Sequence, residues 1–226
     1  MTKKLILFIL LLSFITSNAQ DTIRAVMAPV QKYSWSILYK INGINQKYIT
    51  DATIQDGAFA MVIPKGSEAG MYRILYDNDQ NKYIDFIYNH EPIELTFHPE
   101  HPAELVKYSV SSENKLFQEY LDAIIPIQNK LDTIQTVFFK TKNPKENNQY
   151  CKSYKKYSRE LNKIQRHFET KATPKLAVHF IKANRRFYPP KLIKDINVYL
   201  KTLQSHYFDY IDFIVKVITK VKLSPD

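Results

Sequence analysis

The first half of the chain alternates short apolar runs with turn residues. Seven runs rich in β-branched and aromatic residues follow one another at a spacing of about 8 to 12 residues: 35–41, 48–54, 58–63, 71–76, 83–88, 93–97 and 105–110. Between them lie pairs such as Asn42-Gly43 and Asp56-Gly57, residue types that tolerate a positive φ in turns. The pattern predicts an antiparallel β-sandwich, or an open barrel, over residues 24–111 rather than a parallel sheet with crossover helices.

After residue 111 the apolar period changes from two residues to between three and four. Ser112 stands where a helix cap belongs, and two stripes with helical spacing follow. The first stripe contains Leu116, Tyr120, Ile124, Leu131, Ile134 and Phe138. The second contains Tyr150, Tyr154, Tyr157, Leu161, Ile164 and Phe168. The chain is therefore expected to be an α+β protein, in which a β-sandwich precedes an α-helical unit over residues 112–213.

Two further helices are predicted in the second half. Thr173-Pro174 has the order of a cap followed by a first-turn proline, and Pro189-Pro190 would stop the helix that it opens. A last helix is predicted from about residue 195 to residue 213. Its buried candidates are Val198, Tyr199, Leu203, Tyr207, Tyr210 and Ile211.

The two ends of the chain have patterns of their own. Residues 1–19 carry two lysines, an apolar run and a small-residue end, which is typical of a secretory signal peptide cleaved between Ala19 and Gln20. The expected location is the periplasm or another part of the cell envelope, with no membrane span after cleavage. Residues 214–226 alternate apolar residues with lysine, as an edge strand or an irregular tail would.

Charge divides the chain at the same place as periodicity. Residues 20–111 contain 8 basic and 11 acidic side chains, whereas residues 112–226 contain 22 basic and 11 acidic ones. Basic helices suggest nucleic acid in an intracellular protein, but secretion argues against that partner. Solvated helix faces or contact with an anionic envelope surface remain as interpretations.

Cys151 is the only cysteine in 226 residues. A catalytic dithiol needs a second cysteine to resolve the mixed disulfide, and one cysteine cannot form an internal bridge. Cys151 lies at the margin of the second helical stripe, so we expect it to be half-buried and to pack as a small hydrophobic residue. A regulatory or intermolecular thiol is the alternative.

Other chemical candidates are weak. His90, His98 and His101 do not follow the spacing of a structural zinc site, and the acidic run that begins at Asp77 lacks the glycine and glutamate of a calcium loop. The serine of residues 66–70 is misplaced for a nucleophile elbow. We therefore predict no catalytic residue, no cofactor-binding residue and no metal site.

Several segments resemble the N-terminal region of TlpA-like thiol-disulfide oxidoreductases of the Gram-negative envelope. They are ITDA at 49–52, DGAF at 56–59, IP at 63–64, GMYR at 70–73, IDFIYN at 84–89, ELTF at 94–97, SENK at 112–115, LAVHFIKA at 176–183 and HYFDYIDF at 206–213. The resemblance covers most of the mature chain and implies a β-sandwich domain of unknown function followed by a helical segment. The thioredoxin-like domain with its Cys-X-X-Cys, which the family carries downstream, has no counterpart here, so no redox-active residue is carried over.

The leading expectation is a non-catalytic accessory or binding module of the envelope, whose partner is an envelope protein or a thioredoxin-like domain. Trp35, Tyr48 and Tyr83 are its candidate contact residues, although strand aromatics more often belong to a core. Two alternatives stay open. The chain is a truncated or split oxidoreductase, or it is a stand-alone structural domain that binds anionic envelope surfaces.

Overall fold

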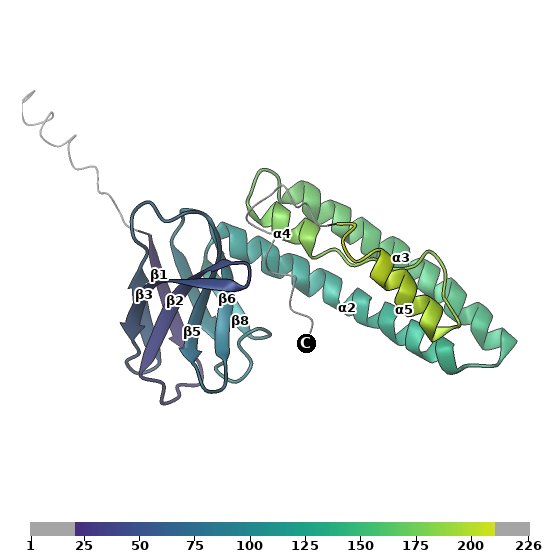
Figure 1. Ribbon diagram of the computed structural model, residues 1–226, viewed down its shortest axis with the longest axis horizontal. Helices are drawn as coiled ribbons and strands as arrows, with labels where there is room; N and C mark the ends of the chain where they lie inside the picture. The colour runs from purple at the N-terminus through teal and green to yellow at the C-terminus, as the bar shows by residue number, and fades with distance from the viewer. Residues whose placement is uncertain (1–20, 211–226) are drawn as a thin grey trace, which may run out of the picture.

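The structure, a computed structural model, describes residues 21–210, which hold eight strands followed by four helices (Figure 1). The strands are β1 (Thr22–Met27), β2 (Trp35–Asn42), β3 (Asn45–Thr53), β4 (Ala58–Val62), β5 (Gly70–Asp77), β6 (Lys82–Tyr88), β7 (Ile93–Phe97) and β8 (Val106–Val110). The helices are α2 (Ser112–Lys140), α3 (Pro144–Lys171), α4 (Ala177–Ala183) and α5 (Ile196–Ser205). The change from strands to helices therefore falls at Ser111.

Some predictions fall outside this part of the chain. The signal segment, the cleavage point between Ala19 and Gln20, and the tail 214–226 lie outside the described residues. Among residues 21–210, no helix combines the length and hydropathy that crossing a membrane requires.

The strands form two four-stranded sheets, with the orders β4-β1-β7-β8 and β3-β2-β5-β6. All pairs are antiparallel except one, since β1 lies parallel to β7. The predicted α+β class is confirmed. The prediction of seven antiparallel strands was wrong in one respect, because it missed β1 and the parallel pairing of β1 with β7. Pairing between strands this far apart in sequence leaves no local signal.

A single buried cluster draws side chains from both sheets. In β1, Ile23, Ala25 and Met27 alternate with exposed residues, as expected for a strand with one covered face. Tyr76 of β5 contacts Phe97 of β7 across the sheets, with 5.1 Å between ring centroids, and its hydroxyl donates to the carbonyl oxygen of Pro99 at 2.7 Å. Each large side chain buried in this way contributes about 1.5–3 kcal/mol.

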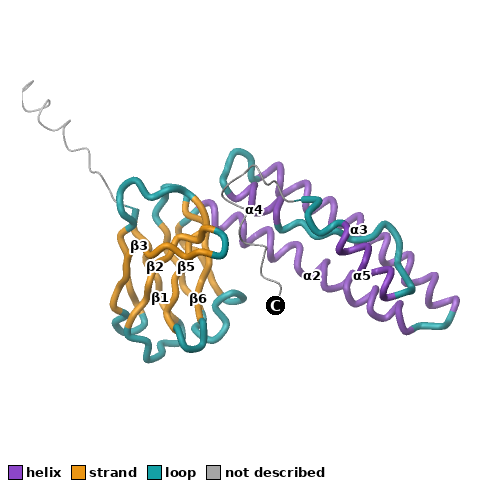
Figure 2. The backbone as a smooth tube through the Cα atoms, in the orientation of Figure 1, coloured by secondary structure: helices purple, strands orange, loops and turns teal. Residues whose placement is uncertain are grey.

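The helices form a second buried cluster, which begins on the outer face of the second sheet. Met71 and Ile87 on that face belong to the same cluster as Leu116 and Tyr120 of α2. α2 and α3 then run side by side away from the strands, with α4 and α5 along them (Figure 2). The two predicted stripes are confirmed in their buried positions: Leu116, Tyr120, Ile124 and Leu131 of α2, and Tyr154, Leu161 and Phe168 of α3.

Three boundaries differ from the predictions. The cap of α2 is Ser111, whose hydroxyl accepts from the Asn114 N–H at 3.1 Å, rather than Ser112. Thr173-Pro174 does not open a helix, because the backbone turns there and α4 begins at Ala177. Within the described residues the last helix ends at Ser205, and α5 has no buried residue, so the predicted burial of Val198 and Tyr207 was wrong. Helical periodicity does not determine how deeply an apolar face is covered.

Hydrogen bonds at the start of α2 tie the helices to the sheets. The buried Asn114 carboxamide accepts from the Ile87 N–H at 2.8 Å and donates to the Ile87 carbonyl oxygen at 2.7 Å, on the edge strand β6. The buried Glu113 carboxylate accepts from the Ala177 N–H at 2.7 Å, at the start of α4, and from the Asn89 amide at 2.7 Å. Adjacent residues of α2 therefore hold both a strand and another helix.

Glu91 closes the same junction from the loop after β6. Its carboxylate accepts from the Ser111 hydroxyl at 2.6 Å and from the backbone N–H groups of Ser112 and Glu113 at 3.1 and 3.0 Å. Partial burial raises the pKa of Glu91, but these hydrogen bonds, joined by the Ser112 hydroxyl, outweigh it and hold the pKa below its ordinary value. A carboxylate at a helix N-terminus is further favoured by the helix dipole.

Asn114→Leu tests the junction. The substitution keeps the size of the side chain but leaves the Ile87 N–H and carbonyl without their partner, so the free energy of unfolding should fall by about 2–3 kcal/mol. Urea denaturation at neutral pH measures it. Asn129→Leu, at an exposed position of the same helix, is the matched control. Equal effects of the two substitutions would contradict the assigned role.

Glu91→Gln tests the pH dependence that follows from the lowered pKa. Because the folded state favours the charged form, the contribution of Glu91 is present above the ordinary carboxylate pKa and is lost as the pH falls through the folded one. Between about pH 5 and about pH 3 the unfolding free energy of the variant should therefore fall less than that of the parent protein. Glu160→Gln, on the exposed surface of α3, should keep the parent slope. Parallel curves for Glu91→Gln and the parent would refute the assignment.

Candidate binding cavity in the helical unit

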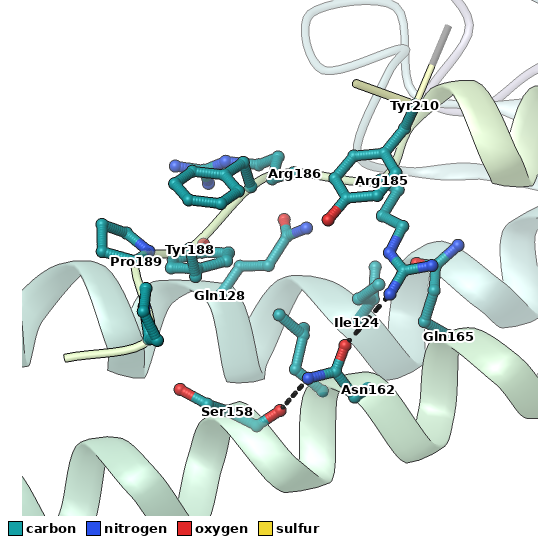
Figure 3. A pocket seen from close by; sticks show the side chains of 13 residues that line it. Ile124, Gln128, Ser158, Asn162, Gln165, Arg185, Arg186, Tyr188, Pro189 and Tyr210 are labelled. Carbon is teal, nitrogen blue, oxygen red and sulfur yellow. Dashed lines mark hydrogen bonds between the residues drawn. The ribbon is translucent and has the colours of Figure 1, made fainter. Parts of the chain in front are cut away.

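A cavity of about 390 Å³ lies where α2 and α3 face the segment between α4 and α5 (Figure 3). This volume falls within the range of about 300–1,000 Å³ typical of small-molecule sites. The lining residues are Ile124 and Gln128 of α2, Ser158, Leu161, Asn162 and Gln165 of α3, the connecting residues 185–190, and Tyr210.

Helical spacing explains why α2 and α3 present these side chains together. Ile124 and Gln128 are four residues apart on α2, and the four residues of α3 fall at successive steps of three, one and three. Residues three and four apart share a helix face. The stripe that buries Leu161 thus also carries Ser158 and Asn162 to the cavity wall.

The connecting segment is fixed to the two helices by side-chain hydrogen bonds. The Tyr154 hydroxyl donates to the Pro189 carbonyl oxygen at 2.9 Å. The Gln135 amide donates to the Ile193 carbonyl oxygen at 2.7 Å and accepts from the Ile193 N–H at 3.3 Å. Backbone groups outside regular structure need such partners. The wall that this segment makes is therefore held in place from α2 and α3.

Arg186 serves mainly to hold the wall. Its guanidinium donates twice to the Asp132 carboxylate, at 3.0 and 3.2 Å, and lies over the ring of Tyr188 at 5.2 Å from the centroid. This bidentate pair fixes both the position and the orientation of the planar group. Burial raises the pKa of Tyr188, so its hydroxyl stays protonated near neutral pH.

Arg185 is less fully engaged. Its guanidinium donates to the Asn162 side-chain oxygen at 3.2 Å, approaches the Glu169 carboxylate at 3.8 Å and lies 4.5 Å from the centre of the Tyr210 ring. A guanidinium carries five N–H donors in a planar fork. Its position beside Asn162 and Gln165 directs this group toward the cavity (Figure 3).

Two polar residues of α3 play opposite parts in the cavity. The Gln165 amide accepts from the Tyr120 hydroxyl at 2.9 Å and donates to Glu169 at 2.8 Å and to the Ile181 carbonyl oxygen at 3.1 Å. These bonds connect α3 to α2 and α4, so Gln165 has a structural role. The buried Ser158 hydroxyl, in contrast, has no hydrogen-bond partner among the described residues. An unsatisfied buried hydroxyl costs about 1–3 kcal/mol, and a ligand atom in the cavity would remove that cost.

Cys151 lies on α3 outside this cavity. The structure shows a free, exposed cysteine. The prediction that it is half-buried and packs as a small hydrophobic residue was therefore wrong. One residue past Tyr150 the helix has turned far enough to place Cys151 on the exposed surface.

The three aromatic contact candidates do not gather at one place. Trp35 is 38% exposed at the start of β2, and Tyr48 is 54% exposed on the edge strand β3, so the alternative that they belong to the core is wrong for both. The Tyr48 hydroxyl donates to Asp51, and its ring meets Tyr39 at 6.5 Å. Tyr83 lies on the opposite edge strand, beneath the guanidinium of Arg73 at 3.5 Å from the ring centre.

The residues that were weak candidates for metal sites lie in loops and at the turn after β5. The rings of His98 and His101 lie 5.3 Å apart, and His98 accepts from the Glu100 N–H at 3.2 Å. Asp77 accepts from the N–H groups of Asp79 and Gln80, each at 3.0 Å, as in a turn. Over residues 21–210, no group of three or more metal-ligating side chains comes together.

The basic residues of α3 lie on its exposed face, as the interpretation of solvated helix faces predicted. Lys152, Lys155, Lys156, Arg159, Lys163 and Arg166 are all exposed. Contact with an anionic surface through this face stays a prediction. The polar cavity residues Ser158 and Asn162 were missed, because single polar residues within a helical stripe form no recognisable motif.

Comparison with known proteins adds no identification to this geometry. No protein-family model matches the chain, and no curated protein matches it. The cavity and its chemistry are therefore interpreted from the chain's own residues.

Proposed function

We propose that this protein is a non-catalytic binding module of the cell envelope, and that the cavity between α2, α3 and residues 185–190 is its ligand site. The observation that carries the proposal is the combination at this cavity of the Arg185 donors with the unpartnered Ser158 hydroxyl. The resemblance to the N-terminal region of TlpA-like oxidoreductases, with the two sheets as a β-sandwich, agrees with such an accessory role.

The chemistry of the lining favours binding over proton transfer. The lining residues bring guanidinium groups, amides, a hydroxyl and phenols to one place. Guanidinium and amide groups keep their protonation state near neutral pH, and they recognise a polar ligand through hydrogen bonds. The walls are preorganised by the Tyr154 and Gln135 hydrogen bonds, which lowers the cost of ordering them around a ligand.

The same lining indicates the class of ligand. Arg185 offers a forked donor that suits a carboxylate, and Asn162 and Gln128 offer amide partners for a peptide-like group. Phe187, Tyr188 and Tyr210 supply aromatic surface. A small carboxylate that also carries an amide and a ring fits all three features, as the C-terminal end of a peptide does.

N-acetylphenylalanine is a suitable probe, because it combines a carboxylate, an amide and a ring. Calorimetric titration should give saturable binding to the parent protein, and Arg185→Ala should weaken it about ten- to a hundredfold through loss of the charged hydrogen bonds. Arg159→Ala removes an exposed arginine of α3 outside the cavity and should leave binding unchanged. Equal binding by the parent and Arg185→Ala would contradict the assigned site, and lack of binding by the parent would exclude this ligand class.

A second candidate function, part of a split thiol-disulfide oxidoreductase, is favoured by one observation. The only thiol of the chain is exposed on α3 and therefore accessible to a partner. Thiolate attack on a disulfide would form a mixed disulfide, and a second thiol must resolve it. In this hypothesis that thiol belongs to a separate thioredoxin-like domain.

Reduction of insulin by dithiothreitol tests whether Cys151 acts as a redox thiol in this chain alone. We expect neither the parent protein nor Cys151→Ser to accelerate it, because the chain has no second cysteine. The turbidity of the precipitating insulin chain measures the rate. Acceleration by the parent protein that is lost in Cys151→Ser would make Cys151 a working thiol and overturn the non-catalytic assignment.

A further inference from the structure

A second cavity, which we call the lysine cleft, lies among the strands and carries a net positive charge. It measures about 390 Å³ and is lined by residues that include Lys40, Lys47, Lys65 and Glu68. The lining thus contains three lysines and one glutamate. The cleft is separate from the cavity of the helical unit and shares no residue with it.

Lys40 is unusual for its burial. It shares the inner face of β2 with Ser36 and Leu38, and its side chain is only 10% exposed. Lysine is rarely buried unless its charge is paired. Its described partner is Glu68, whose side chain is 82% exposed. A buried cation is therefore matched by an anion that lies mostly in solvent.

The strand register adds to the positive charge. It places Lys40 opposite Lys47 of β3 on one side and opposite Tyr72 of β5 on the other. Like charges directly opposite each other on neighbouring strands are destabilising. The hydrogen bond and the charge of Lys40 lower the pKa of Glu68, with a further contribution from Lys47. The single carboxylate of Glu68 thus interacts electrostatically with two lysines, Lys40 and Lys47.

We propose that the lysine cleft binds a phosphomonoester, whose dianionic phosphate lies between Lys40 and Lys47 and displaces Glu68. Lysine binds phosphate as a point charge, and once Glu68 is displaced the two negative charges of the ligand lie against the two ammonium groups of Lys40 and Lys47. Glu68 can leave because it is exposed. The Tyr72 hydroxyl donates to the Glu68 carbonyl oxygen at 2.7 Å and so fixes the backbone at this point while the side chain moves.

The volume of the cleft exceeds that of a phosphate group, so a small polar remainder such as a glycerol or sugar fits with it. The phosphomonoester can belong to a soluble metabolite or to a lipid head group. Glycerol 3-phosphate represents the soluble source. Phosphatidylcholine vesicles that contain phosphatidic acid represent the lipid source, and both probes present the same phosphomonoester.

Titration of the purified protein with glycerol 3-phosphate at low, constant ionic strength is the first experiment, with glycerol and sulfate as controls. We expect saturable binding that Lys40→Met weakens by at least about tenfold, because an ammonium at the centre of the cleft is lost. Lys107→Met, which removes an exposed lysine from the other sheet, should bind as the parent does. Glu68→Gln should bind more tightly, because the competing carboxylate is gone.

Several outcomes would overturn the proposal. The first is that the parent protein binds neither probe. The second is that Lys40→Met and Lys107→Met lose binding equally. The third is that Glu68→Gln binds more weakly than the parent protein. Binding to the vesicles alone would support the site and assign it to lipid, whereas binding to glycerol 3-phosphate alone would assign it to a soluble ligand.

Thermal unfolding of each variant without ligand checks that the Lys40→Met protein is folded. Replacing a buried ammonium by a side chain of similar volume is expected to preserve the fold.

Discussion

The Asn114 carboxamide replaces a neighbouring strand at the edge of the second sheet, since it accepts from the N–H of Ile87 and donates to its carbonyl oxygen. Next to it, Glu113 holds the start of α4. The first turn of α2 is therefore connected both to β6 and to α4, and the direction of the helical hairpin follows from these contacts. Because α2 also carries one wall of the cavity, the position of that wall relative to the sheets depends on this junction.

The sequence was sufficient to predict features that have a local period. Alternation along the strands and the stripes of α2 and α3 predicted the core positions, since each residue there has one covered face. α5 shows the limit of that reasoning. Its sequence has the spacing of an amphipathic helix, yet Ile196, Val198 and Leu200 are about half exposed. Periodicity identifies the element, while the depth of burial is set by neighbours that are distant in the chain.

The candidate sites were less predictable than the fold. The cavity uses Ser158 and Asn162 from one helix and residues 185–190 from a segment with no period at all, and only the folded chain brings these together. Charge counting was misleading in the strands, because residues 20–111 have an acidic excess in total. The register nevertheless places Lys40 beside Lys47, which makes one basic cleft in an acidic unit. Local field and net charge are different quantities.

The two sites differ in how the protein compensates their cations. In the helical unit, Arg186 has a bidentate partner in Asp132 and Arg185 has Glu169 nearby, so the site is close to neutral before any ligand arrives. In the lysine cleft, two adjacent ammonium groups share one exposed carboxylate. The ligand proposed for the cavity would therefore be selected chiefly by shape and hydrogen bonds, whereas the ligand proposed for the cleft must bring negative charge. Because Lys40 is buried, salt in solution screens its attraction to that ligand less than it would between exposed groups.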